Sequence, residues 1–226
     1  RPAEIKPNSL KNNKEMHMKK PKYKLIIFDL GRVLVDFNHW LAARRIVKYT
    51  NKSLQETYNL FFDSSLTKQF EEGKLSGFEF FSRLKKKLQL NISYRDFVPI
   101  WNEIFFISPK NKQVQRIAKT VKTRYKILLL SNINKLHFDY LKEKFPGALK
   151  IFPRIVLSYV IGFRKPHPVI YKKALKYFKA KPKETIYIDD RANLIEKAAG
   201  LGIKSLHFIA VEKLKKDLRS LGIETI

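Results

Sequence analysis

The stretch that decides the fold is KLIIFDLGRVL, residues 24–34. Its first part, residues 25–28, is a continuous apolar run, and the run ends in the acid Asp29. A short run of this kind is typical of a strand that is buried on both faces of a parallel sheet. Because ligands bind beyond the carboxyl ends of such strands, Asp29 is a candidate site residue.

Further along the chain, strands and helices alternate. We predict strands over residues 125–130, 154–158, 185–188 and 203–209. We predict helices over residues 111–123, 134–145, 166–178 and 192–199, and from residue 211 onward. This order predicts an α/β fold: a doubly wound, Rossmann-like parallel sheet with helices on both faces.

The segment between the first strand and residue 108 has a different pattern. Phe78, Phe81, Leu84 and Leu88 recur at helical spacing, and residues 93–106 resemble a further helix. No strand-like alternation is visible in this segment. We therefore predict a core made of residues 23–36 and 108–226, with a small all-helical cap, residues 37–107, inserted after the first strand.

Composition limits the class of protein. The chain has no cysteine, which excludes disulfides, thiolate metal sites and cysteine nucleophiles. It has no apolar run of about 18 residues, so we expect no membrane partner and a cytoplasmic location. Residues 1–22 are rich in lysine and proline and predict a disordered basic tail, with Met16 or Met18 as a candidate natural start. Nothing in the sequence indicates the oligomeric state.

The net charge of +27 has two interpretations. One is attraction to a polyanion, such as nucleic acid, a membrane surface or an anionic substrate. The other is a lysine-rich chain whose lysines lie on solvated faces. The lysines are spread along the whole chain among ordinary amphipathic patterns, and this distribution favours the second interpretation.

Polar side chains follow several of the predicted strands and converge on one edge of the sheet. Each one alone could be a helix cap or a surface residue. Their conjunction at one edge favours a site, which comprises Asp29, Ser131, Asn132, Lys165, Asp189 and Asp190.

These residues stand in a known pattern. The stretches Phe28–Leu34, Leu130–Asn132, Gly162–Pro166 and Ile188–Asp190 resemble the four motifs of the haloacid dehalogenase-like superfamily. The helical insert resembles the small cap of that superfamily. Within it, Phe70–Ser76 and residues 94–105 resemble glucose-1-phosphate phosphatase-like members.

The resemblance implies a chemistry. Asp29 would attack phosphorus and form an aspartyl-phosphate, and Lys165 would supply positive charge in the transition state. Ser131 and Asn132 would bind the phosphoryl oxygens. Mg²⁺ would be held by Asp29, Asp190 and the backbone carbonyl of Gly31, with Asp189 in support. The cap would close over the site and select a small phosphorylated substrate, with a sugar phosphate as one candidate.

The sequence departs from the pattern near the nucleophile. Most phosphatases of the superfamily carry a second Asp at the position of Gly31, and usually a glycine at the position of Arg32. The missing carboxyl would normally protonate the leaving group, a contribution of about 10²–10⁴-fold. Glucose-1-phosphate phosphatase-like members also have glycine there, so activity is still expected. Asp36 or an acid of the cap could serve instead. Asn193 replaces an Asp that is frequent in relatives.

Three alternatives remain open. A metal-free dehalogenase would use Asp29 to attack carbon, but the Asp189–Asp190 pair argues for a metal. A catalytically impaired binding module is suggested by Gly31, and a nucleic-acid-associated phosphatase only by the charge. His17, His39, His137, His167 and His207 show no ligand spacing, so we interpret them as ordinary surface or core residues.

Overall fold

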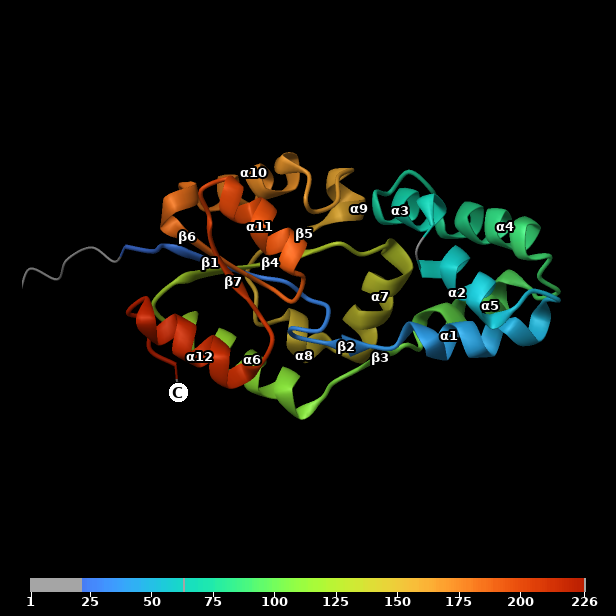
Figure 1. Ribbon diagram of the computed structural model, residues 1–226, viewed down its shortest axis with the longest axis horizontal. Helices are drawn as coiled ribbons and strands as arrows, with labels where there is room; N and C mark the ends of the chain where they lie inside the picture. The colour runs from blue at the N-terminus through green and yellow to red at the C-terminus, as the bar shows by residue number, and fades with distance from the viewer. Residues whose placement is uncertain (1–21, 63, 226) are drawn as a thin grey trace, which may run out of the picture.

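The computed structural model describes residues 22–62 and 64–225 (Figure 1). The predicted basic tail, residues 1–22, lies outside the described residues except for Lys22.

The core is a five-stranded sheet in the order β5-β4-β1-β6-β7. Its strands are β1 (Leu25–Phe28), β4 (Lys126–Ser131), β5 (Ile155–Leu157), β6 (Thr185–Asp189) and β7 (Lys204–His207). Every neighbouring pair is parallel. The predicted doubly wound α/β fold is therefore confirmed. Strands β4 and β6 run one residue further than predicted, so Ser131 and Asp189 are the last residues of their strands.

The sheet is covered on both faces because successive strand residues point to opposite sides. Ile26 and Phe28 pack against α6 (Pro109–Val121), α8 (Pro146–Leu149) and α12 (Val211–Ser220). Leu25 and Ile27 pack against α10 (Pro168–Tyr177) and α11 (Ala192–Gly200). The two groups of helices lie on opposite sides of the sheet in Figure 1.

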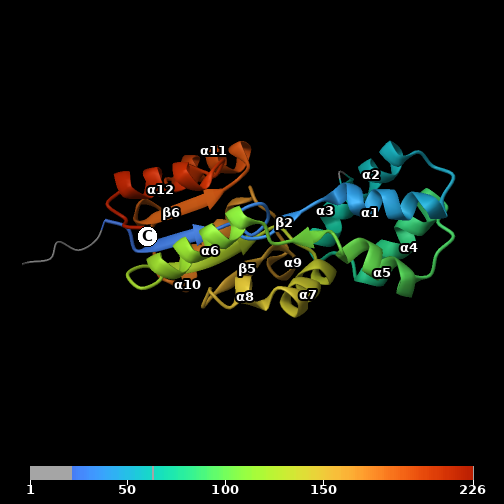
Figure 2. The ribbon, with the colours of Figure 1, turned by 90° about the horizontal axis from the view of Figure 1, so that it is seen from below.

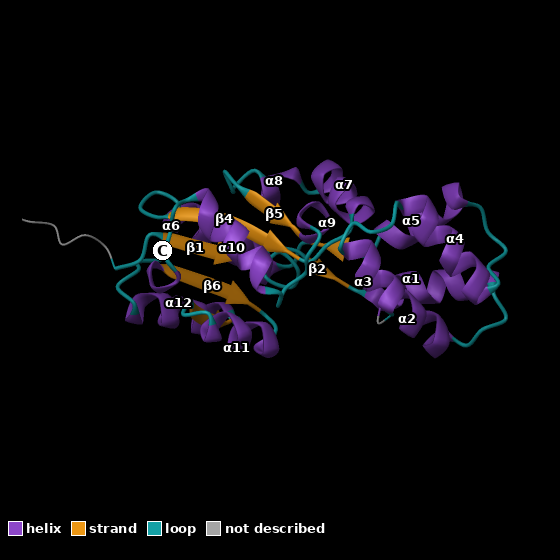
Figure 3. Cartoon of the chain, turned by 90° about the horizontal axis from the view of Figure 1, so that it is seen from above, coloured by secondary structure: helices purple, strands orange, loops and turns teal. Residues whose placement is uncertain are grey.

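The inserted segment forms a separate helical layer beside the carboxyl ends of the strands (Figures 2 and 3). Its helices are α1 (His39–Ile46), α2 (Leu54–Phe62), α3 (Ser65–Glu71), α4 (Gly77–Leu88) and α5 (Tyr94–Asn102). They share a hydrophobic cluster of their own, which includes Phe61, Phe80, Phe97 and Trp101. Two further helices of the core, α7 (Lys135–Lys144) and α9 (Ser158–Ile161), lie on the side of the core that faces this cap.

The prediction of an all-helical segment over residues 37–107 was wrong at its two ends. Helix α5 ends at Asn102, and Phe105–Phe106 forms a short strand, β3, that pairs antiparallel with β2 (Asp36–Phe37). The two chain crossings between cap and core run side by side there, so each satisfies backbone hydrogen-bonding groups of the other. A two-residue strand carries no periodicity that a sequence could display.

Among the described residues, no helix has the length and apolar character needed to cross a membrane.

Candidate active site

The centre of the site is a buried ammonium group between two carboxylates. Lys165 Nζ lies 2.5 Å from Asp29 Oδ1 and 2.7 Å from Asp189 Oδ2, and it also donates to the Leu130 carbonyl at 3.1 Å. The three acceptors satisfy all three protons of the ammonium group. Asp29 follows the central strand β1, while Lys165 lies in the loop before α10. The parallel sheet thus brings together residues that are far apart in the chain.

Asp189 holds this arrangement in place. Its Oδ2 also accepts a hydrogen bond from the Tyr187 hydroxyl, and its Oδ1 accepts one from the backbone N–H of Arg191 at 2.9 Å. The side chain of Asp189 is fully buried. Because both of its oxygens are engaged, Asp189 fixes Lys165 rather than presenting a free ligand.

The electrostatics of the cluster follow from its burial. Burial raises the pKa of Asp29, and the charges of Asp189 and Asp190 raise it further, while Lys165 opposes both effects. Burial works against the charged form of Lys165, yet the charges of Asp189 and Asp29 outweigh it and raise the pKa of the lysine. Lys165 is therefore a permanent cation next to a carboxylate whose charge depends on its surroundings.

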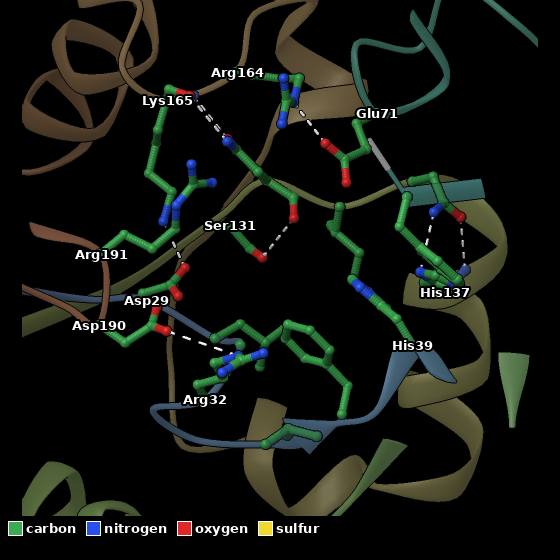
Figure 4. A pocket seen from close by; sticks show the side chains of 18 of the residues that line it. Asp29, Arg32, His39, Glu71, Ser131, His137, Arg164, Lys165, Asp190 and Arg191 are labelled. Carbon is green, nitrogen blue, oxygen red and sulfur yellow. Dashed lines mark hydrogen bonds and ion pairs between the residues drawn. The ribbon is translucent and has the colours of Figure 1, made fainter. Parts of the chain in front are cut away.

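Ser131 and Asn132 have different roles in the structure. The Asn132 side chain accepts from the backbone N–H of Lys165 at 2.7 Å and donates to the carbonyl of Lys165 at 3.0 Å. It therefore fixes the backbone that carries the lysine. The Ser131 hydroxyl has only a long contact, 3.5 Å, to the Asn132 carbonyl, and it faces the cavity (Figure 4). Of the pair, Ser131 is the freer donor for an anion.

A metal site fits the acidic cluster. Asp29, Asp189 and Asp190 can each offer an oxygen, and these oxygens lie within 4.8 Å of one another. Gly31 lines the same cavity as Asp29 and Asp190. Carboxylate and carbonyl oxygens are the ligands that Mg²⁺ prefers. Since both oxygens of Asp189 are engaged, the better placed carboxylate ligands are the second oxygen of Asp29 and the carboxylate of Asp190, whose one ion pair, with Arg32, is long at 3.9 Å.

Glycine at position 31 has a steric reason. A Cβ there would lie 2.8 Å from Cε1 of Phe37, so the Phe37 ring fills the space that a side chain would need. The ring is stacked against His39 at a centroid distance of 4.6 Å, and the Arg32 guanidinium lies 5.1 Å from its centre. Gly31 itself does not adopt a left-handed backbone. The residue that does so is Arg32, with φ of 59°.

The cavity above the cluster has a volume of about 440 Å³ and is lined by both cap and core. The core provides Asp29, Asp190, Ser131 and Arg164. The cap provides aromatic side chains, including Phe62 and Trp101, and one acid, Glu71. A cavity of this size and mixed lining suits a small polar metabolite.

Two histidines line this cavity, although their spacing in the sequence gave no sign of it. His39 stacks on Phe62 at a centroid distance of 3.9 Å. His137 donates from Nε2 to the Trp101 carbonyl at 3.0 Å, and its Nδ1 is 3.1 Å from the Asn134 amide nitrogen. Burial lowers the pKa of His39 to about 4, with Arg32 adding to the effect. It lowers the pKa of His137 to about 3, so both rings are neutral at neutral pH.

The cap is docked on the core at the rim of the cavity. Glu71, the last residue of α3, forms an ion pair with Arg164 at 2.6 Å, and its carbonyl accepts from the Ser158 hydroxyl at 2.6 Å. Glycine is required just beyond, because a Cβ at Gly73 would lie 2.1 Å from the Tyr159 carbonyl oxygen. Glu71 and Arg164 both lie in stretches of the sequence that resemble family motifs, but only the tertiary structure shows that they pair.

Comparison with known proteins agrees with this geometry. The family model of the haloacid dehalogenase-like hydrolases matches residues 23–202. The D-ribitol-5-phosphate phosphatase of Bacteroides thetaiotaomicron is 26% identical over 187 residues, covering 80% of this chain and 90% of that protein. The glyceraldehyde 3-phosphate phosphatase of Pyrococcus furiosus is 27% identical over 206 residues, covering 83% of this chain and 81% of that protein.

A solved structure shares the arrangement of most of the chain. The crystal structure of a HAD family enzyme from Bacteroides thetaiotaomicron in a magnesium complex has a TM-score of 0.73 and 25% identity, covering 84% of this chain and 94% of that one. The four motifs, the fold that brings them together and the match over residues 23–202 lead to one conclusion: the chain is an enzyme that belongs to the haloacid dehalogenase-like hydrolases.

Proposed function

We propose that the protein hydrolyses the phosphate monoester of a small polyhydroxylated alcohol or sugar, through an aspartyl-phosphate on Asp29, with Mg²⁺ as cofactor. The observation that carries the proposal is a cluster of three carboxylates, two of them paired with one buried lysine, at the floor of a cavity between cap and core. The relatives named for ribitol 5-phosphate and glyceraldehyde 3-phosphate support the substrate class.

Each residue of the site has its own role in the reaction. Asp29 is the nucleophile, and its approach to a phosphate dianion is made possible by the positive charge of Lys165. Ser131 donates to a phosphoryl oxygen, while Asn132 and Asp189 hold Lys165 in position. Mg²⁺, held by Asp29, Asp190 and the Gly31 carbonyl, would neutralise charge on the phosphoryl oxygens.

The cap excludes bulk water from the reaction. Its contacts with the core at Glu71 and Trp101 hold it over the cavity. Exclusion of water strengthens the interaction of Lys165 and the metal with the developing charge, because the local dielectric constant is low. The cavity volume of about 440 Å³ limits the alcohol to a small molecule.

The other interpretations receive less support. A metal-free dehalogenase would leave the carboxylate of Asp190 without a catalytic role, since Lys165 is already fixed by Asp29, Asp189 and the Leu130 carbonyl. A nucleic-acid substrate is favoured only by the net charge of +27, whereas the cavity is bounded on one side by the cap.

The test is a screen of phosphorylated polyols and sugars with and without Mg²⁺, using wild type, Asp29→Asn and Asp36→Asn. Asp36 is the matched control, because it is a buried carboxylate that pairs with Lys110 at 3.0 Å and does not line the cavity. We expect Mg²⁺-dependent release of phosphate by wild type and Asp36→Asn, and none by Asp29→Asn. Turnover by Asp29→Asn, or acid-stable phosphoenzyme on another residue, would exclude Asp29 as the nucleophile.

A further inference from the structure

Because position 31 carries no carboxyl group, another group must protonate the leaving alcohol. When Asp29 attacks phosphorus in line, the leaving oxygen departs on the opposite side, toward the cap. A sugar or polyol alkoxide is a poor leaving group unless it receives a proton. The Phe37 ring occupies the space beside Gly31, so the proton must come from elsewhere.

The cavity lining offers one further acid. Its carboxyl groups are Asp29 and Asp190, which belong to the nucleophile and metal cluster, and Glu71. Asp36, the other substitute considered from the sequence, does not line the cavity. The two lining histidines are neutral, and both ring nitrogens of His137 are engaged by Trp101 and Asn134.

Resting on the proposed function, we propose that Glu71 of the cap is the general acid that protonates the leaving alcohol. Figure 4 shows Asp29 and Glu71 on opposite sides of the cavity with Ser131 between them. Arg164, which pairs with Glu71, is the immediate neighbour of Lys165 in the chain, so the acid is tied to the same loop that presents the catalytic lysine.

The charges around Glu71 suit this role. Burial raises the pKa of Glu71, and the neighbouring Glu72 raises it as well, while Arg164 and Arg191 lower it. Burial thus favours the acid form of Glu71. The carboxylate that remains after proton transfer is stabilised by the guanidinium of Arg164.

The two half-reactions balance. In the first, a bond forms between an Asp29 oxygen and phosphorus, the bond from phosphorus to the alcohol oxygen breaks, and that oxygen takes the proton of Glu71. In the second, a water attacks phosphorus, the Glu71 carboxylate takes a proton from the water, and the Asp29–phosphorus bond breaks. Asp29 is regenerated as carboxylate and Glu71 as acid.

The experiment compares an alkyl phosphate, ribitol 5-phosphate, with an aryl phosphate, p-nitrophenyl phosphate, whose leaving group needs no proton. Glu71→Gln should lower kcat/KM by about 10²–10⁴-fold on the alkyl ester and by less than about tenfold on the aryl ester. The basic limb of the pH–rate profile on the alkyl ester should also disappear. Glu72→Gln is the matched control, because Glu72 pairs with Lys74 and does not line the cavity. It should keep the basic limb, moved to lower pH because the charge of Glu72 raises the pKa of Glu71.

Two more variants separate chemistry from cap docking. Arg164→Gln should move the basic limb to higher pH, because it removes the charge that lowers the pKa of Glu71. Glu71→Asp should recover part of the alkyl activity if Glu71→Gln folds poorly. An equal loss by Glu71→Gln on both esters would overturn the proposal and leave Glu71 as a docking residue. If wild type hydrolyses neither ester with Mg²⁺, the proposed function itself fails.

Discussion

Replacement of Lys165 by methionine tests the electrostatic centre of the site. The ammonium group lies 2.5 Å from Asp29 and 2.7 Å from Asp189, and its side chain is only 2% exposed. Methionine fills similar volume but leaves two buried carboxylates facing each other. Removal of one partner from a buried ion pair costs about 3–5 kcal/mol of folding free energy. Since whole domains are stable by roughly 5–15 kcal/mol, the loss is a large share of the total.

The loss of folding free energy caused by Lys165→Met should depend on pH in a definite direction. Without Lys165, the pKa of Asp29, already raised by burial, rises further. An acid whose pKa is raised in the folded state contributes stability at low pH and loses that contribution as pH rises through the folded pKa. The destabilisation of Lys165→Met should therefore be larger at pH 8 than at pH 5.

The measurement is denaturation by urea and by heat at both pH values. We expect a fall in melting temperature of roughly 6–20 °C at pH 8, from about 2–4 °C per kcal/mol for a chain of this size. Lys173→Met on α10 is the control, because Lys173 is exposed, and its midpoint should not change. A loss below about 1 kcal/mol, or the same loss at both pH values, would refute this account of the cluster.

Three further predictions concern the metal, the nucleophile loop and the cap interface. Mg²⁺ at about 100 times its Kd should stabilise the wild type by about 2.7 kcal/mol in a thermal shift assay, and Asp190→Asn should remove most of that shift. Gly31→Asp should reduce activity, because a Cβ at position 31 would lie 2.8 Å from the Phe37 ring. The double variant Gly31→Asp with Phe37→Ala should restore turnover on alkyl phosphates. Equal kcat/KM for the single and the double variant would contradict the steric explanation. His137→Phe should cost about 1–3 kcal/mol at pH 7, since the buried Trp101 carbonyl loses its donor. A histidine whose pKa is lowered to about 3 in the folded state stabilises the fold above pH 6.5 and loses that contribution as pH falls. In chemical denaturation, the free energy of unfolding should therefore fall less between pH 6 and pH 4 for His137→Phe than for wild type.

Several features of the site had no signal in the sequence. The neighbours Glu71 and Glu72 cannot be told apart by pattern, yet one faces the cavity and pairs with Arg164 while the other pairs with Lys74. His39 and His137 are almost a hundred positions apart, and only the docking of cap on core brings both to one cavity. The pairing of β2 with β3 was missed because two residues are too few to show a period.

The sequence by itself determined the fold class and the candidate residues at the floor of the site. Continuous apolar runs that end in polar residues predict parallel strands, and the rule that ligands bind beyond the carboxyl ends of such strands selects Asp29, Ser131 and Asp190 without coordinates. Lys165 is selected by its place at the turn before a helix and by its resemblance to a family motif. The tertiary structure alone decided which groups are free to act. Asp189 and Asn132 hold Lys165 rather than reaching outward, the Phe37 ring explains Gly31, and Glu71 enters from the cap. The physical reason is that strand and helix patterns depend on near neighbours in the chain, whereas burial, ion pairing and steric exclusion depend on distant segments that meet only when the cap closes on the core.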